Sequence, residues 1–288
     1  MRRSLIAVVV IATLAAACSN GSTGDRTTQA TSPPATITTT APAAPSTRPG
    51  LVVYALAETA DLFGPYLVAV AREGVTEATA AAAVDMVLAG LTFTETGHGL
   101  WTEIPPGLHA NFVGVGDDGI VTVDLPREFE MGGGTATMLG RLAQLVASVL
   151  DIPGAEGVRL AIDGTAVDVF SSEGIVLDDP MTRDSIREFV APVSVASPAW
   201  GATVSVPFRV NGSTREASAV GWALTDRDGR IVVEGVVPVD GVSFRIDVSP
   251  PSSAIDPAAA PYQHTLTVWE DIDGAQRNIM ECVLSLDV

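Results

Sequence analysis

The sequence predicts an α+β protein in which a mixed N-terminal domain is followed by a β-sandwich. Helix-like and strand-like patterns alternate across residues 51–190, whereas residues 191–288 show short strand patterns only. Beyond residue 49 the chain has about 240 residues, which is enough for two domains of ordinary size. We therefore expect domains at 50–190 and 191–288, behind an exported and tethered N-terminus.

Residues 1–17 have the composition of a signal peptide. Arg2 and Arg3 form a basic start, an apolar run follows, and small residues lead to Cys18. The apolar segment 5–17 would cover only ~20 Å as a helix, against roughly 30 Å of bilayer hydrocarbon, so we expect export rather than a permanent span. The arginine pair also allows a twin-arginine export signal, which the following SLIA fits poorly.

The letters LAAAC that end at Cys18 resemble the lipobox of bacterial lipoproteins. In that motif the chain is cut before the cysteine and the sulfur is acylated, for example with palmitate. Ala15 stands where the motif prefers a branched aliphatic residue. The resemblance implies that lipidated Cys18 anchors the protein at the outer face of the cytoplasmic membrane. Plain secretion, with Cys18 merely near a cleavage site, is the alternative.

Residues 18–49 are rich in Ser, Thr, Pro and Ala and contain almost no apolar mass, which predicts a disordered tether. Such a coil would average roughly 30 Å end to end. The folded part could therefore stand clear of the membrane.

Acidic residues dominate the charge of the chain. It has 34 Asp and Glu against 16 basic residues, all of them Arg, for a net charge of −18. Such a surface repels phosphate backbones and anionic headgroups. We expect no nucleic-acid partner.

In the N-terminal part, strands are expected wherever apolar residues cluster or alternate between turn signals. The predicted strands are 51–56, 66–73, 109–115, 120–125, 157–163 and 166–170.

Two helices are predicted between these strands. Residues 76–91 are rich in Ala, with Thr76 as an N-cap and Gly90 near the end. Across 135–150, leucines and valines recur at three- and four-residue steps, which indicates an amphipathic helix capped by Thr135. The glycine run before this helix lacks the Lys of a phosphate loop and follows an acidic segment, so we expect it only to free the backbone.

The C-terminal part is predicted to be strands separated by NGST, DRDGR, VDGV and DIDGAQ, a β-sandwich pattern. Trp222 and Trp269 fall within predicted strands, where we expect both to lie in the core. DRDG and DIDG also look like the start of a calcium loop. Each lacks the third acidic ligand and the final Glu of an EF-hand, so turns are the better interpretation.

These features together resemble a known family. Residues 51–190 carry VVYAL, VLAGL, LWTEIPPGLHANFVGVGDDGIVTVDLPREFE and LDDPMTRDSIREF in the order of the sporulation and spore germination (GerMN) domain. The resemblance implies a ring-building-like α/β fold of the kind used in envelope-spanning assemblies. It does not imply a role in sporulation, since related domains occur in lipoproteins of non-sporulating bacteria.

Residues 191–288 are similar to the immunoglobulin-like domain of bacterial spore germination proteins, through VASPAWGATVSVPFRVNGST, LTDRDGRIVVEG and LTVWEDIDG. The segment between Gly212 and Gly221 departs from that pattern, because TREASAV stands where an aromatic residue followed by Glu is usual. The resemblance implies an immunoglobulin-like β-sandwich.

The segment 113–125, VGVGDDGIVTVDL, matches the G-x-G-x-x-G spacing of a dinucleotide-binding turn. A strand pattern follows Gly119 where that turn needs a helix, and Asp117 and Asp118 would repel a phosphate. We expect instead a β-hairpin that turns at Asp118-Gly119, and no nucleotide.

No reactive constellation stands out among the nucleophiles and bases. His98, His109 and His264 lie in no metal-binding or catalytic spacing, and His264 is expected to be a satisfied or surface residue. Cys282 lies in an apolar alternation, which predicts burial and inertness. We expect no catalytic residue, no cofactor and no metal site.

Adjacent carboxylates do not define a glycosidase site either. Such a site needs two carboxyl groups ~5–10 Å apart on either side of a sugar. Neighbouring residues in a strand point to opposite faces, and in a turn to solvent. The pairs concerned are Asp117/Asp118, Asp178/Asp179 and Glu270/Asp271.

The sequence therefore favours a lipid-anchored, non-catalytic module of the bacterial cell envelope that binds an envelope protein or self-associates. The alternative is a cell-wall protein that binds, or hydrolyses, peptidoglycan or another glycan.

Overall fold

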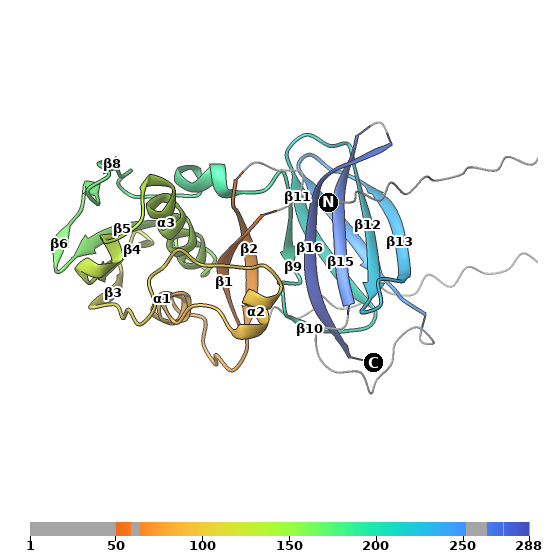
Figure 1. Ribbon diagram of the computed structural model, residues 1–288, viewed down its shortest axis with the longest axis horizontal. Coiled ribbons are helices and arrows are strands. Elements are labelled where there is room, and N and C mark those ends of the chain that lie inside the picture. The colour runs from red at the N-terminus through yellow and green to blue at the C-terminus, as the bar shows by residue number, and fades with distance from the viewer. Residues whose placement is uncertain (1–49, 59–63, 252–263, 273, 288) are drawn as a thin grey trace, which may run out of the picture. The chain divides into compact units, whose positions relative to one another are not determined.

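A computed structural model describes residues 50–58, 64–251, 264–272 and 274–287. The predictions for the signal peptide, Cys18 and the tether lie outside these residues. All the described residues fall within one compact unit, Pro42–Val288. They form a mixed α+β structure made mostly of strands, as predicted (Figure 1).

Two sheets build most of the N-terminal part. β1 (Leu51–Ala57) and β2 (Tyr66–Arg72) pair as an antiparallel two-stranded sheet. The second sheet has the order β3-β4-β5-β6, with β4 parallel to β5. Its strands are β3 (Phe112–Val115), β4 (Ile120–Leu125), β5 (Gly157–Ile162) and β6 (Thr165–Ala166).

Helix α3 (Thr135–Leu150) connects the parallel strands β4 and β5 and has the predicted bounds. It is buried on more than one face, however, because every residue from Gly140 to Leu150 is buried. It packs against β1, β5 and α1 (Ala80–Leu88), so solvent reaches only its first turns. The hydrophobic spacing thus located the helix correctly but underestimated how deeply it lies.

Both predicted N-caps were wrong. The Thr79 hydroxyl, not that of Thr76, accepts from Ala82 N–H at 3.2 Å, so α1 begins later than expected. The N-cap of α3 is Gly134, which has no side chain for capping. The Thr135 hydroxyl instead donates to Glu173 Oε2 at 2.7 Å and links α3 to a later loop.

Shorter elements complete the N-terminal part. The predicted strand 109–115 begins only at Phe112, and the predicted strand 166–170 is two short strands in separate sheets. The remaining elements are α2 (Phe93–Gly97), the 3-10 helices η1 (Arg127–Glu130) and η2 (Asp184–Phe189), and the hairpin β7 (Val169–Phe170) with β8 (Ile175–Val176).

The hairpin predicted within 113–125 is confirmed. β3 and β4 pair antiparallel, and the turn closes through Gly116 N–H to the Ile120 carbonyl at 2.9 Å. Gly119 has φ +76°, which a residue with a side chain rarely adopts. Asp118 Oδ1 accepts from Ile120 N–H at 3.1 Å, so this acid supports the turn.

Two sheets form the C-terminal part. The three-stranded sheet has the order β14-β11-β9, with β9 (Val193–Ser197), β11 (Phe208–Thr214) and β14 (Ser243–Val248). The five-stranded sheet has the order β10-β16-β15-β12-β13. Its strands are β10 (Thr203–Ser205), β12 (Ala219–Asp226), β13 (Ile231–Pro238), β15 (His264–Ile272) and β16 (Ala275–Asp287). Inward side chains of both sheets belong to one buried apolar cluster that continues into the N-terminal part.

Two details of the C-terminal prediction were wrong. NGST does not separate strands but ends β11, where the ring of Phe244 lies over Gly212. Trp222 is buried in the core as predicted, but Trp269 is only partly buried. Trp269 lies on the opposite face of the sheet, across Gly221, where a Cβ would collide with its ring. The alternation of side chains along β15 places Trp269 on that face, because His264, Leu266 and Val268 face inward.

Candidate functional site

The segment around Trp200 joins the two parts of the unit. Trp200 N–H donates to the Ala69 carbonyl at 2.8 Å, and Ala71 N–H donates to the Trp200 carbonyl at 2.9 Å. The next residue, Gly201, donates from its N–H to the Val283 carbonyl on β16 at 2.8 Å. Backbone hydrogen bonds therefore tie β2 and β16 to the same short segment.

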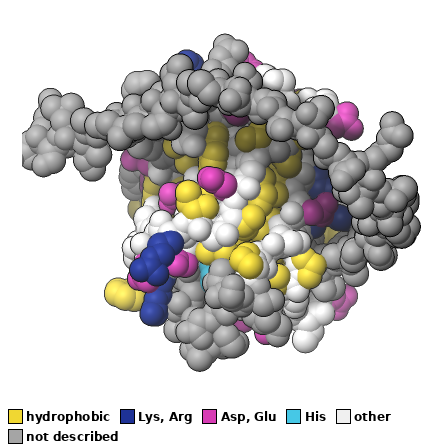
Figure 2. Space-filling view, turned by 90° about the vertical axis from the view of Figure 1, so that its right-hand side faces the viewer, with side chains coloured by type: hydrophobic (Ala, Val, Ile, Leu, Met, Phe, Trp, Pro, Cys, Tyr) yellow, Lys and Arg dark blue, Asp and Glu magenta, His cyan; other side chains and the backbone are white. Residues whose placement is uncertain are grey.

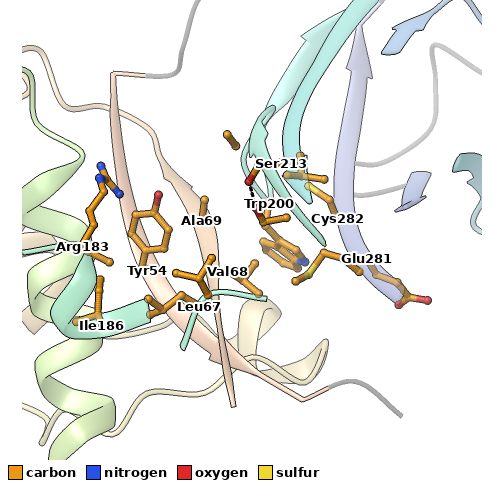
Figure 3. Close-up of a pocket in the computed structure, with 16 residues that line it drawn as sticks. Tyr54, Leu67, Val68, Ala69, Arg183, Ile186, Trp200, Ser213, Glu281 and Cys282 are labelled. Atoms are coloured by element: carbon orange, nitrogen blue, oxygen red, sulfur yellow. Dashed lines mark hydrogen bonds between the residues drawn. The ribbon is translucent and has the colours of Figure 1, made fainter. Parts of the chain in front are cut away.

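A cavity of about 260 Å³ lies beside this junction. Figure 3 shows Tyr54, Arg183 and Ile186 on one side of it and Trp200, Cys282 and Ser213 on the other, with β2 between them. Most of its walls are apolar and come from β2, η2, β9 and β16. The lining includes Leu67, Val68, Ala69, Val195, Ala196 and Met280.

Polar groups in the cavity wall are mostly tied to the protein. Arg183 Nη2 donates to the Leu150 carbonyl at 2.7 Å at the end of α3. The hydroxyls of Ser194 and Ser213 bond to each other at 2.9 Å across β9 and β11. These bonds fix the walls and favour a preformed cavity.

Cys282 lies in this wall, and its predicted burial is confirmed. The side chain is 3% exposed, and the Sγ–H donates to the Pro198 carbonyl at 3.6 Å. Burial raises the pKa of the Cys282 thiol to about 12. The thiol is therefore protonated at neutral pH and is a poor nucleophile.

A second hollow of about 390 Å³ is also lined by Trp200, together with Glu58, His98 and Glu281, among others. The His98 ring meets Trp200 edge-on with 5.5 Å between centroids, and His98 Nδ1 lies 2.8 Å from the Thr94 carbonyl. Trp200 itself is 3% exposed, so it offers no open ring face for stacking.

The prediction for His264 was wrong, because this residue is neither satisfied nor at the surface. It is 5% exposed at the start of β15, and neither ring nitrogen has a hydrogen-bond partner among the described residues. Burial lowers the pKa of His264, an effect that the nearby Asp226 carboxylate partly opposes. His109 is exposed, and these two histidines lie outside the cavity lining.

The adjacent carboxylates take structural positions. Asp117 and Asp118 are exposed in the β3–β4 turn, and Asp179 accepts from Arg159 Nε at 2.6 Å at the surface. Glu270 faces inward and is 1% exposed, whereas its neighbour Asp271 is only partly buried. Across the described ranges, no group of three or more His, Cys, Asp or Glu is placed to hold a metal ion.

The acidic residues of DRDG and DIDG bind backbone groups of the protein itself. The N–H groups of Arg230 and Asp228 bond to Asp226 Oδ1, which lowers the pKa of Asp226 and closes a turn between β12 and β13. Gly274 N–H bonds likewise to Asp271 Oδ1. The predicted turns are confirmed as far as these residues are described.

Arg141 was missed as a structural residue. It is 5% exposed on α3 and donates to the carbonyls of Glu103, Phe129, Met131 and Gly132 at 2.7–3.0 Å. Burial lowers the pKa of its guanidinium, while Glu103 opposes that effect. These bonds hold the glycine-rich loop against the helix, a role that the sequence pattern does not reveal.

The cavity itself was also missed. Its walls come from segments more than 200 residues apart, such as Leu67 and Cys282, and no motif joins them. The available signal was the burial predicted for Cys282, which does not by itself indicate a cavity. Among the helices of the described residues, none combines the length and the apolar character needed to cross a membrane.

Comparison with known proteins gives a family match in the N-terminal segment. Residues 52–168 match the model of the Germane family, described as sporulation and spore germination. This part of the chain is therefore similar to the family that the resemblance implied, over a match that covers less than half of the chain. None of the curated proteins compared with the chain matches it.

Several solved structures are distantly similar. The first GerMN domain of the sporulation protein GerM from Bacillus subtilis is 14% identical with a TM-score of 0.38, and covers 46% of this chain and 97% of its own. The tandem GerMN domains of the same protein are 16% identical with a TM-score of 0.40, and the match covers 70% of this chain and 62% of that chain. A candidate lipoprotein from Clostridium perfringens is 17% identical with a TM-score of 0.33, and the match covers 48% of this chain and 89% of that chain. These TM-scores are too low to support an argument about function.

Proposed function

We propose that this protein is a non-catalytic interaction module, held at the outer face of a bacterial cytoplasmic membrane by a lipid on Cys18. The observation that supports binding over catalysis is the cavity between β2 and β16. It has apolar walls, fixed polar groups and, in Cys282, a thiol whose pKa of about 12 keeps it protonated. The anchor rests on the LAAAC sequence alone.

The proposal assigns separate domains to the two parts of the unit. Residues 50–190 form a ring-building-like GerMN domain, and residues 191–288 form an immunoglobulin-like sandwich from the three- and five-stranded sheets. The family match at 52–168 supports the first assignment. The shared core of the two C-terminal sheets supports the second.

Exposed apolar side chains on outer strands also favour protein partners. β13 is an edge strand, and its Ile231 and Val236 are 58% and 60% exposed. Figure 2 shows several apolar side chains, with acidic ones around them, on the side of the molecule that carries β13. Phe93, the first residue of α2, is 93% exposed. Unpaired strand edges and apolar surface of this kind mark interaction sites.

The partner that we propose is an envelope protein or a second copy of the chain. The net charge of −18 disfavours nucleic acid, and the β3–β4 hairpin occupies the segment that resembled a nucleotide loop. The buried ring of Trp200 gives no support to the alternative of a glycan-binding protein, which often uses an open aromatic face.

Cell fractionation tests the anchor and the binding role together. We expect the wild-type chain in the membrane fraction and the Cys18→Ser variant outside it, with in vivo crosslinks to an envelope protein lost in the variant. A variant that is freely secreted and still fully functional would contradict the proposal. Retention on purified cell wall, or release of muropeptides, would favour the glycan alternative.

A further inference from the structure

The outer edge of β2 carries backbone groups that lack hydrogen-bond partners within the described part of the chain. In an antiparallel pair, the peptide groups of successive residues point alternately toward the partner strand and away from it. Ala69 and Ala71 point away from β1, because both bond to the backbone of Trp200. Leu67 lies two residues before Ala69 and therefore points the same way.

Three peptide groups on this edge have no hydrogen-bond partner among the described residues: the Leu67 N–H, the Leu67 carbonyl and the Ala69 N–H. Leu67 and Ala69 are each only 7% exposed, so bulk water has little access to them. Buried peptide groups are nearly always paired, because leaving one unpaired costs free energy.

The cavity of about 260 Å³ opens on this edge. Leu67, Val68 and Ala69 all line it, although Val68 points to the opposite face of the β1–β2 sheet from the other two. A cavity that meets both faces of a strand must run around its edge. The unpaired groups therefore border the cavity, opposite the apolar side chains of Met280 and Cys282.

We propose that the β2 edge binds an extended peptide segment of a partner protein, which continues the pairing that Trp200 begins. The peptide's backbone pairs with Leu67 and Ala69, and one of its apolar side chains enters the cavity. Addition of a strand to a sheet edge gives affinity through main-chain hydrogen bonds and specificity through such pockets.

The size of the cavity limits that side chain. An apolar cavity of about 150 Å³ can hold benzene. The larger cavity beside β2 accommodates a side chain of the size of Leu, Met or Phe, and its mostly apolar walls favour an apolar one. This inference rests on the proposed function, because it names the chemistry of the partner.

A peptide library tests the inference. Random seven-residue peptides are displayed against the full-length chain in detergent, and enriched peptides are resynthesised. We expect an apolar residue at one fixed position, and at least tenfold weaker binding when the backbone amides of the pairing residues are N-methylated. N-methylation of the peptide amides that point away from β2 should have little effect on binding. Absence of enrichment, or equal binding by both methylated forms, would overturn the inference.

A filled cavity provides the matched variant. Ala196 is exposed on β9 and lines the cavity, so Ala196→Trp should weaken the selected peptides at least tenfold. Ala275 is an exposed alanine on β16 outside the cavity lining, and Ala275→Trp should leave binding within twofold. Equal binding to both variants would contradict the site. If Ala196→Trp fails to fold, the methylated peptides still decide the matter.

The Cys18→Ser variant separates this inference from the proposed function. It should bind the selected peptides as tightly as the wild-type chain, because the cavity is far from Cys18 in sequence. If the wild-type chain binds the peptides but does not associate with the membrane, the result contradicts the proposed lipid anchor and supports the peptide site at β2.

Discussion

The Thr214 hydroxyl donates a hydrogen bond to the carboxylate of Glu270 and so joins the last residue of β11 to the middle of the other sheet. The second carboxylate oxygen accepts from Asn278 Nδ2 on β16. Both Thr214 and Glu270 are almost fully buried. This buried pair therefore connects the two C-terminal sheets through polar rather than apolar contact.

Removal of the Thr214 hydroxyl should destabilise the C-terminal part. Thr214→Val leaves the buried Glu270 carboxylate one donor short, which typically costs about 1–3 kcal/mol. Urea unfolding followed by tryptophan fluorescence measures the loss. The control is Thr203→Val, at an exposed threonine of β10, and an equal effect in the two variants would contradict the role assigned to Thr214.

Stability should fall in mild acid because of His264. Burial lowers the pKa of this residue in the folded state, so below about pH 6.5 the unfolded chain takes up the proton first. The free energy of unfolding is then highest above that pH and decreases as the pH falls toward the folded pKa. The His264→Phe variant should lose this part of the pH dependence in unfolding measured over roughly pH 7.5 to 5. A His109→Phe control should keep it, and identical profiles for the two variants would refute the assignment.

The Cys282 thiol should be inert in the folded chain. Its raised pKa of about 12 and its burial leave almost no thiolate at neutral pH. In a Cys18→Ser background, where Cys282 is the remaining cysteine, we expect a thiol reagent to label the protein only after denaturant is added. Rapid labelling of the native chain would show instead that the cavity wall opens to solvent.

Arg141 should be needed for the loop that precedes α3. Arg141→Lys cannot reproduce the fork of donors that reaches four carbonyls, so we expect a loss of roughly 2–4 kcal/mol. Arg127, whose side chain is 73% exposed, provides the matched control Arg127→Lys, which should change the unfolding midpoint little. Similar midpoints for both variants would show that the loop does not depend on these bonds.

Local sequence signals predicted the local structure well. The leucine and valine spacing located α3 at its observed bounds, and Asp118-Gly119 located the β3–β4 turn. Both depend on interactions within a few residues. The N-cap predictions were wrong, because Thr76, Thr79 and Thr135 have the same capping chemistry and only the path of the chain selects among them.

Features set by tertiary packing could not be read from the sequence. Trp222 and Trp269 both lie in strands, yet the register of β12 and β15 sends one into the core and the other across Gly221. His264 was expected to be a satisfied or surface residue, but its alternation with Leu266 places it inside. The cavity depends on the approach of β2 to β16, which no local pattern encodes.

Amide hydrogen exchange along β2 is the sharpest test of strand addition at this edge. In the full-length chain, the amides of Val68 and Val70 point toward β1 and should exchange slowly, while those of Leu67 and Ala69 lack a hydrogen-bond partner among the described residues and should exchange faster than these neighbours. With the tightest peptide from the library, Leu67 and Ala69 should become as protected as their neighbours. Equal protection of all four amides without peptide, or no change at Leu67 and Ala69 with it, would contradict the proposal that the β2 edge binds a partner strand.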